Sequence, residues 1–480
     1  APPSSIGKFG GDTDNWIWPR HTGDFSMFRV YASKDNRPAA YSPQNVPYRP
    51  KKHFSISTKG VKEGDFTMIY GFPGNTQEYI LSDAVAYIAE RSDPAKIAIR
   101  TGRLDIITKA QESDPALRIH YAAKHASIAN AWKKWQGEAL GIDRRGTVAA
   151  KFDYETQFGL WSVGRPEYAG VVMGLRAEYD RIMDAYFAYE ITRETLSTLP
   201  AAYTPEERAE ECFARRKFAE QALWRHAFRE YGRCPKVYRT PSYAEGMARY
   251  KSPEAYADAL FEAVWEGSDS VAMQPAVRLR EETKRMLDHI SWMLGTKSLR
   301  NLNSKILNEL YTTYIKGLRE WDRERAFYPD ANLTLRVAYG SVAGYEYADG
   351  EYHKPQTTLD GIIAKDNPEI YDYDIPQSLR DLYASKNYGR WGTVIDGRRT
   401  VPVCFLATNH TTGGNSGSPV LNAGGELIGI NFDRTWRSTM SDIAFDPAIC
   451  RNIAVDIRYV LFVVDRVGGA GYLLKEMTLK

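Results

Sequence analysis

Ser416 has the setting in this sequence that points most directly to chemistry. It lies in the segment GNSGSP, residues 414–419, between the apolar runs VPVCFLATN and VLNAGGELIGINF. A serine nucleophile needs a turn that projects its Oγ outward and backbone N–H groups that hold a developing oxyanion. Glycines at 413, 414 and 417 permit such a turn, and the N–H groups of Gly414 and Ser416 are the natural donors. A glycine-rich hairpin turn without catalytic role is the alternative, and the two β-like flanks favour the nucleophile.

The surroundings of Ser416 distinguish between classes of serine hydrolase. The segment departs from the G-x-S-x-G elbow of α/β-hydrolases, because Ser418 stands where that pattern has glycine and no helix is expected to follow. It resembles instead the G-D-S-G-G-P signature of chymotrypsin-like peptidases, with Asn415 and Ser418 substituted. That resemblance implies the chain order His, Asp, Ser for the catalytic groups.

Asp24 is the candidate acid that would orient a catalytic histidine. It directly precedes the run FSMFRVYA, residues 25–32, whose residue types predict a β-strand, as expected for this acid. Asp12 and Asp14 are rivals, but they lie in GGDTDNW with no strand immediately after them. An aspartate in a strand-entry turn is the ordinary alternative for Asp24.

The elements that must position these groups fall into three segments, and 480 residues are too many for one hydrophobic core. Residues 1–82 predict β-structure, with strands at 25–32 and 65–72. Residues 83–328 predict helices, ended by FYPDAN. Residues 329–480 predict strands again, with YVLFVV (459–464) as a buried strand and SLRDLYASKN (378–387) as a short helix. The clearest helical stripe is formed by Leu302, Ile306, Leu310, Tyr314, Leu318 and Trp321.

Composition excludes several classes of function. A net charge of +3 without a dense Lys/Arg run argues against nucleic-acid binding, and no apolar stretch reaches the ~18 residues of a membrane span. The four cysteines are far apart and form no CxxC pair, which argues against zinc and leaves free thiols or disulfides open. We expect no metal and no cofactor.

Longer motifs resemble one particular family. NWIWPRHTGDFSMFRVY, GFPGNT, FYPDAN, GGNSGSPVLNAGGELIGINFDR and DIRYVLFVVDRVGGAGYLL are similar, in order, to segments of the bacterial dipeptidyl peptidases 7 and 11. The resemblance implies an α+β fold: a chymotrypsin-like double β-barrel with a large inserted helical domain. Residues 1–82 would be the remainder of an incomplete first barrel, 83–328 the helical insertion capping the cleft, and 329–480 the second barrel with Ser416. It also implies a periplasmic or secreted homodimer acting on peptides with a free N-terminus.

The resemblance assigns substrate-binding roles to five residues. Asn15 and Trp16, Asn130 and Asp433 would bind the substrate N-terminus, each matching by its local motif (DNW, ASIANAW and NFD). Arg434, 18 residues after Ser416, would lie in the S1 pocket and pair with an Asp or Glu at P1. A glycine there resembles the relative that prefers a hydrophobic P1. The alternative for Arg434 is a solvent-facing or ion-paired arginine.

The histidine that the nucleophile needs is harder to place. The family carries it upstream of the acid in a T-N-H-H-C-like motif, and only 23 residues precede Asp24 here. His21 is too close to Asp24 in sequence to meet both partners, and His410 falls where the floor of the S1 pocket is expected. The chain also opens without an initiator methionine or signal peptide. We therefore expect a fragment whose base lies outside it, with almost no activity by itself.

Three functions follow from these patterns. The first is a serine dipeptidyl peptidase with Asp/Glu preference at P1, acting through an acyl-enzyme. The second is a non-catalytic protein that binds peptide N-termini on the same scaffold, and a dipeptidyl peptidase with hydrophobic P1 preference is a variant of the first. The third, an endopeptidase, is disfavoured if Asn130 and Asp433 close the non-prime side.

Overall fold

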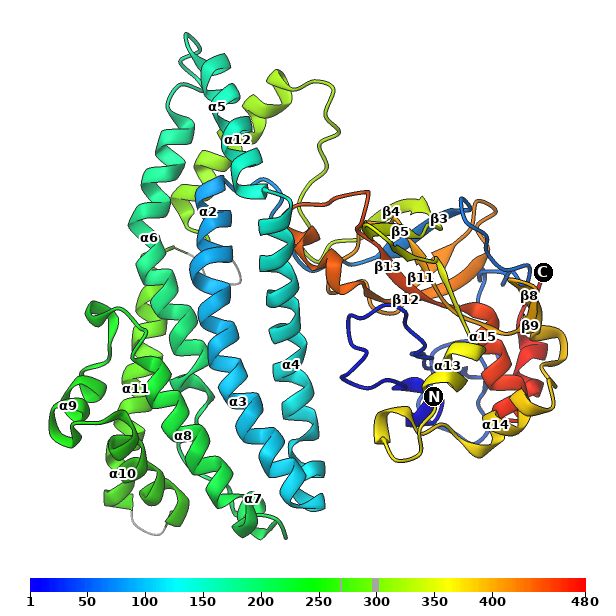
Figure 1. The fold of residues 1–480 in the computed structure, drawn as a ribbon, viewed down its shortest axis with the longest axis horizontal. Coiled ribbons are helices and arrows are strands. Elements are labelled where there is room, and N and C mark those ends of the chain that lie inside the picture. The colour runs from blue at the N-terminus through cyan, green and yellow to red at the C-terminus, as the bar shows by residue number, and fades with distance from the viewer. Residues whose placement is uncertain (268–269, 296–301) are drawn as a thin grey trace. The chain divides into compact units, whose positions relative to one another are not determined.

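The computed structural model describes residues 1–267, 270–295 and 302–480, which divide into two compact units (Figure 1). The sheet-containing unit joins residues 1–78 to 330–480, and the helical unit comprises 79–329. The mixture of helix and sheet confirms the predicted α+β class.

The helical unit consists of helices joined by short connections. They are α2 (Ser82–Ala86), α3 (Asp93–Ser113), α4 (Pro115–Arg144), α5 (Thr147–Ser162), α6 (Val171–Glu194), α7 (Pro205–Ala209), α8 (Lys217–Tyr231), α9 (Pro241–Tyr250), α10 (Pro253–Glu266), α11 (Ser270–Met293) and α12 (Lys305–Trp321), with a π-helical turn at Tyr87–Ser92. Capping explains several starts: Asp114 Oδ1 accepts from the N–H of Ala116 at 2.7 Å, one residue before the proline that opens α4.

The predicted apolar stripe near α12 is correct except at its start. Ser304 caps the helix, so α12 begins at Lys305 and Leu302 lies before it, although it is buried. Ile306 is 46% exposed, whereas Leu307 is 1% exposed. The buried face therefore runs through Leu307, Tyr314 and Leu318 at the spacing of one helical face.

The sheet-containing unit is organised around one antiparallel sheet with the order β4-β3-β11-β12-β13-β10-β7. Its strands are β3 (Phe66–Gly71), β4 (Arg336–Ser341), β7 (Gln356–Thr358), β10 (Pro402–Ala407), β11 (Ser418–Leu421), β12 (Leu427–Arg434) and β13 (Asn452–Asp456). Three two-stranded sheets pair β1 (Tyr31–Ala32) with β2 (Val46–Pro47), β5 (Tyr345–Ala348) with β6 (Glu351–His353), and β8 (Thr393–Ile395) with β9 (Arg398–Thr400). Every residue of β10 and β13 is buried, as their apolar character requires.

The double barrel expected from the sequence is not seen as a closed barrel among the described residues. The strand β3 lies within the range 1–82 assigned to a first barrel, yet it pairs with β4 and β11. Of the predicted strand 25–32 only Tyr31–Ala32 is a strand, and Phe28 is 88% exposed. One bridge, between Val342 and Ala407, links the segment after β4 to β10 across the sheet.

Short helices complete this unit: α1 (Ser4–Gly7), α13 (Leu359–Lys365), α14 (Gln377–Ala384) and α15 (Ile457–Phe462). The prediction of α14 is confirmed, but the predicted strand at 459–464 is wrong. The side chain of Asp456 accepts from the N–H of Arg458 at 2.9 Å and starts α15 there. A short buried apolar run fits either a strand or a helix, so the cap decides.

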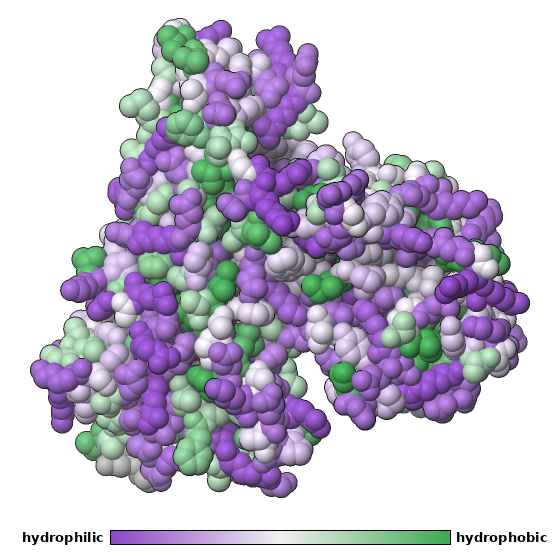
Figure 2. Space-filling view, viewed as in Figure 1, coloured by the Kyte–Doolittle hydropathy of each residue, from purple (hydrophilic) through white to green (hydrophobic). Residues whose placement is uncertain are grey.

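All four cysteines are free, which settles the question that the sequence left open. Within the described ranges, no helix combines the length and apolar character needed to cross a membrane. On the face shown in Figure 2, hydrophilic residues dominate and hydrophobic residues form small separate groups.

Candidate functional site

The turn that carries Ser416 connects β10 to β11, and its glycines are required by its backbone. Gly414 has φ +105° and Gly417 has φ +83°, values that side chains disfavour. A Cβ at Gly414 would lie 2.3 Å from the carbonyl oxygen of Phe72, so only glycine fits there. The N–H of Gly74 donates to Gly413 O at 2.6 Å and ties the turn to the segment after β3.

Ser416 is exposed at the tip of this turn. Its Oγ donates to the carbonyl of Phe432 on β12 at 3.3 Å, a long bond that a substrate can replace. Among the described residues, the N–H groups of Gly414 and Ser416 donate no hydrogen bond. Exposed backbone donors beside an exposed hydroxyl are the arrangement that an oxyanion hole requires.

A chain of buried amides supports the turn from below. Asn415 Oδ1 accepts from the N–H of Thr412 at 3.1 Å, and Asn431 Nδ2 donates to the Asn415 carbonyl at 3.2 Å. Asn452 Nδ2 donates in turn to Asn431 Oδ1 at 2.9 Å. The sequence showed Asn415 only as a departure from a known signature, whereas the structure shows it holding the nucleophile turn. Asn431 and Asn452 were missed, since only strand pairing brings them together.

Asp24 lies near the charges of Arg20 and Asp433. Partial desolvation raises the pKa of Asp24, the Arg20 charge lowers it, and the Asp433 charge raises it again, with a net rise. The side chain is solvent-exposed, so its desolvation is incomplete. The rival Asp14 is buried and committed to Lys365 at 2.8 Å and Tyr373 at 2.9 Å, which makes it a structural residue.

Trp16 and Asp433, which the family resemblance assigns to one substrate site, contact each other. Asp433 Oδ2 accepts from the Trp16 N–H at 3.3 Å, and the Trp16 carbonyl accepts from the Trp436 N–H at 2.5 Å. Trp16 adopts φ +67°, an unfavourable conformation for a tryptophan. Such backbone strain is frequent at ligand sites. Asn15 precedes Trp16 in the same segment.

Arg20 is the neighbour of Asp433 that sequence reasoning missed. Its Nη1 contacts Asp433 Oδ2 at 2.9 Å and donates to the Asp14 carbonyl at 2.8 Å, and its guanidinium lies 5.3 Å from the ring centroid of Phe432. Burial raises the pKa of Asp433, and the Arg20 charge opposes that rise. The only signal in the sequence was its place in the motif WPRH, four residues before Asp24.

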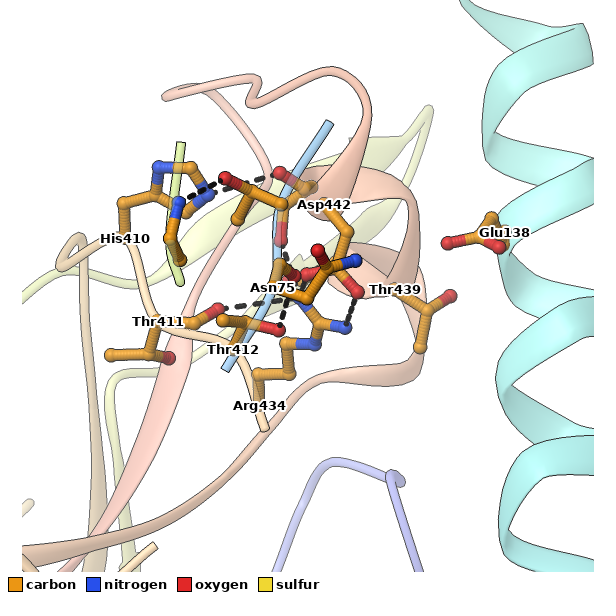
Figure 3. A network of polar contacts seen from close by, with 12 residues as sticks. Asn75, Glu138, His410, Thr411, Thr412, Arg434, Thr439 and Asp442 are labelled. Atoms are coloured by element: carbon orange, nitrogen blue, oxygen red, sulfur yellow. Dashed lines mark hydrogen bonds and ion pairs between the residues drawn. The ribbon is translucent and has the colours of Figure 1, made fainter. Parts of the chain in front are cut away.

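Arg434 is buried and ion-paired (Figure 3). Its Nη1 and Nη2 contact the two carboxylate oxygens of Asp442 at 2.6 and 2.8 Å, and Nη1 also donates to Ser441 Oγ at 2.8 Å. The guanidinium lies 5.6 Å from the ring centroid of Trp16, which places it beside the Trp16–Asp433 pair. Asp442 carried no signal in the sequence, because the 3₁₀ helix Trp436–Asp442 brings it back to Arg434.

His410 belongs to the same network as Arg434 (Figure 3). Its Nε2 lies 3.0 Å from the carbonyl of Ser441 and its Nδ1 lies 3.3 Å from Glu78 Oε1, while its ring stacks on Phe445 with 4.5 Å between centroids. Burial lowers the pKa of His410. These contacts give His410 a supporting role around Arg434.

The other histidine weighed from the sequence, His21, is buried inside the sheet-containing unit. Burial lowers its pKa to about 3, so its ring is neutral. It packs on Gly361, where a Cβ would lie 1.9 Å from its Nε2. In the part of the chain that the structure describes, no hydrogen bond joins Ser416 to any histidine.

Asn130 lies exposed on α4 of the helical unit. Its role at a substrate N-terminus stays a prediction.

One group of side chains in the helical unit has metal-ligating types. Atoms of His120, Glu210 and Cys212 lie within 4.8 Å of one another. A histidine that binds a metal through one ring nitrogen needs a hydrogen-bond acceptor for the N–H of the other. Here Arg216 Nη1, a donor, lies 2.7 Å from His120 Nε2. The arginine therefore makes this group an ion-pair network that does not suit a cation.

Comparisons with known proteins identify the family of this chain. The sequence pattern described as peptidase S46 matches residues 1–209 and 203–479. The Asp/Glu-specific dipeptidyl-peptidase of Capnocytophaga gingivalis is 42% identical over all of this chain and 72% of its own length. The dipeptidyl-peptidase 7 of Phocaeicola vulgatus is 35% identical over all of this chain and 71% of its own length. The crystal structure of Porphyromonas endodontalis DPP11 with the dipeptide Arg-Glu has a TM-score of 0.83 at 34% identity, covering all of this chain and 74% of that one. These matches confirm the resemblance inferred from the motifs: the chain belongs to the peptidase S46 family.

Proposed function

We propose that this protein is a serine dipeptidyl peptidase that releases N-terminal dipeptides with Asp or Glu at P1. One observation carries the proposal: an exposed serine on a glycine turn lies beside a strand that ends in a carboxylate and a guanidinium, Asp433 and Arg434. The relatives from Capnocytophaga gingivalis and Flavobacterium psychrophilum, each 42% identical, are named Asp/Glu-specific dipeptidyl-peptidases.

Ser416 is the nucleophile in this proposal. Its Oγ attacks the carbonyl carbon of P1, and the N–H groups of Gly414 and Ser416 hold the oxyanion. A base takes the serine proton and returns it to the leaving amine, which leaves the dipeptide as an ester on Ser416; water then releases it. Asp24 is the acid that orients the base. The proposal assigns this base to none of the eight histidines of the chain; within the sheet-containing unit, His21 and His410 are held by other contacts.

Recognition of the free N-terminus falls to Asp433, with Asn15 and Trp16 beside it and Asn130 from the helical unit. The Asp433 carboxylate would stabilise the substrate ammonium group by a charge-assisted hydrogen bond. In the structure the same carboxylate forms an ion pair with Arg20, with 2.9 Å between Arg20 Nη1 and Asp433 Oδ2. The helical domain, 83–328, would cap the cleft and exclude longer N-terminal extensions.

Arg434 is the proposed determinant of P1. A guanidinium pairs bidentately with a carboxylate, which favours an acidic P1 side chain. The DPP11 of Porphyromonas endodontalis, crystallised in complex with Arg-Glu, binds a dipeptide whose second residue is acidic. Loss of Arg434 would favour the alternative of a hydrophobic P1.

The finer structural and cellular assignments belong to the same proposal. The bridge between Val342 and Ala407 supports the interpretation of the sheet as the second barrel of a chymotrypsin-like fold, with residues 329–480 at its centre and residues 1–82 contributing to the first barrel. Periplasmic location and homodimer formation rest on resemblance to the family.

A dipeptidyl amide with a fluorogenic leaving group and Asp at P1 tests this function. Without a base the chain should hydrolyse it very slowly, and added imidazole should raise the rate in wild type but not in Ser416→Ala. A rate that is independent of Ser416 would contradict the assignment. Dipeptide binding without imidazole-dependent hydrolysis would favour the second candidate, a non-catalytic protein that binds peptide N-termini, which is suggested by the lack of a histidine bound to Ser416 among the described residues.

A further inference from the structure

The Arg434 guanidinium, which the proposed function pairs with the P1 carboxylate, already forms an ion pair with Asp442. We propose that Asp442 is a specificity-determining residue of the S1 subsite: it holds Arg434 in place without substrate and weakens the attraction of Arg434 for an acidic P1. This inference rests on the proposed function and adds a residue to it.

The pair between Arg434 and Asp442 is direct and nearly buried. Both carboxylate oxygens contact the guanidinium, at 2.6 and 2.8 Å, and the two side chains are 5% and 11% exposed. The Nη1–Nη2 edge of Arg434 is therefore committed to Asp442. A second carboxylate must bind along another edge or displace Asp442.

The segment that carries Asp442 is anchored on several sides, so displacement is unfavourable. The Gln77 N–H donates to the Asp442 carbonyl at 2.6 Å, and Ser441 accepts from Arg434 through its Oγ and contacts His410 through its carbonyl. Asp442 therefore stays bound to Arg434 when a peptide enters, and the guanidinium is shared between two carboxylates.

Sharing has a predictable effect on selectivity. A P1 carboxylate meets a neutral pair instead of a single cation, and two carboxylates on one guanidinium lie about 7 Å apart, where their repulsion in a protein lowers affinity by at least about tenfold. A neutral P1 side chain, in contrast, leaves Arg434 paired with Asp442 and causes no unpaired charge. Asp442 therefore reduces the difference in affinity between peptides with an acidic P1 side chain and peptides with a neutral one.

Titration calorimetry with two dipeptides that differ only in this charge, Arg-Asp and Arg-Asn, tests the inference on the 480-residue chain. In Asp442→Asn, which keeps the shape of the side chain, the Kd for Arg-Asp should fall at least about tenfold and that for Arg-Asn should change less than about twofold. Asp396→Asn is the matched control, because it removes the same charge from an exposed pair with Lys354. A Kd for Arg-Asp that is unchanged or higher in Asp442→Asn would overturn the inference.

The same data separate this inference from the proposed function. If wild type binds Arg-Asp no better than Arg-Asn, the assignment of P1 to Arg434 fails. If wild type prefers Arg-Asp and Asp442→Asn does not increase that preference, only the role of Asp442 fails. Circular dichroism and thermal unfolding establish that the variant is folded. Should it unfold, Asp442→Glu moves the carboxylate by one methylene group and should change the Arg-Asp to Arg-Asn ratio more than about threefold; an unchanged ratio there also overturns the inference.

Discussion

Replacing Arg434 with glycine should change both selectivity and stability, because the guanidinium has an internal partner. For binding, the variant loses a charge-assisted bidentate contact to an acidic P1, worth about 1.5–3 kcal/mol, or about 10- to 150-fold in Kd. Asp442 remains and repels the P1 carboxylate. Arg-Asp should therefore bind to Arg434→Gly more weakly than Arg-Asn does, which inverts the wild-type order.

The stability effect follows from the burial of the same pair. The Asp442 side chain is 11% exposed, so Arg434→Gly leaves a buried carboxylate without its guanidinium. Breaking such a pair costs about 3–5 kcal/mol. Adding Asp442→Ala removes the orphaned charge and should recover part of that loss. Lys354→Ala, which breaks a pair that is 68% and 67% exposed, should change stability by less than about 1 kcal/mol.

Calorimetric binding of the two dipeptides and thermal unfolding of the four proteins measure both effects. The reasoning fails if Arg434→Gly still binds Arg-Asp more tightly than Arg-Asn. It also fails if Arg434→Gly and Lys354→Ala lower the unfolding temperature equally, since burial would then have no influence.

Three further predictions concern the nucleophile turn and a buried histidine. Ser416→Ala should abolish imidazole-dependent hydrolysis and leave the Kd for Arg-Asp within about twofold, because the Ser416 Oγ makes one long hydrogen bond to the described part of the chain. Gly414→Ala should lower that hydrolysis at least about 100-fold by displacing an oxyanion donor, since its Cβ would lie 2.3 Å from Phe72 O; an unaltered rate would exclude this N–H from the oxyanion hole. His21 should lower the stability of the fold in acid, because folding lowers its pKa from about 6.5 to about 3. Its contribution to the free energy of unfolding is complete above pH 6.5 and is lost as the pH falls towards 3. Between pH 7 and pH 4.5, the free energy of unfolding should fall by about 2–3 kcal/mol less in His21→Gln than in wild type, as thermal unfolding can measure. If His53→Gln, a variant of an exposed histidine, shows the same reduction, the prediction is contradicted.

The parts of the site that follow from local chemistry were the predictable ones. Glycines 414 and 417 were expected to allow a special turn, and both have positive φ. The apolar runs of β10 to β13 and the short helix α14 were also foreseen. The strand predicted at 459–464 was wrong because a short buried apolar run fits both elements until Asp456 caps a helix.

The internal partners of the site could not be predicted from sequence. Arg20 contacts Asp433 across 413 positions of chain, and Asp442 contacts Arg434 because the 3₁₀ helix Trp436–Asp442 turns back toward β12. No periodicity or motif records such pairs. These pairs determine how much net charge the site presents to a peptide. The sequence allowed Arg434 to be either an S1 residue or an ion-paired arginine, and the structure shows the ion pair.

The central claim is that this chain recognises both ends of an N-terminal dipeptide, the free amine and an acidic P1 side chain. Calorimetric titration of the 480-residue chain with Arg-Asp, Arg-Asn and N-acetyl-Arg-Asp measures both at once. The claim predicts that Arg-Asp binds most tightly, with Kd at least about tenfold higher for each of the other two, as expected from the loss of one charged contact. Equal affinity for all three dipeptides would contradict it.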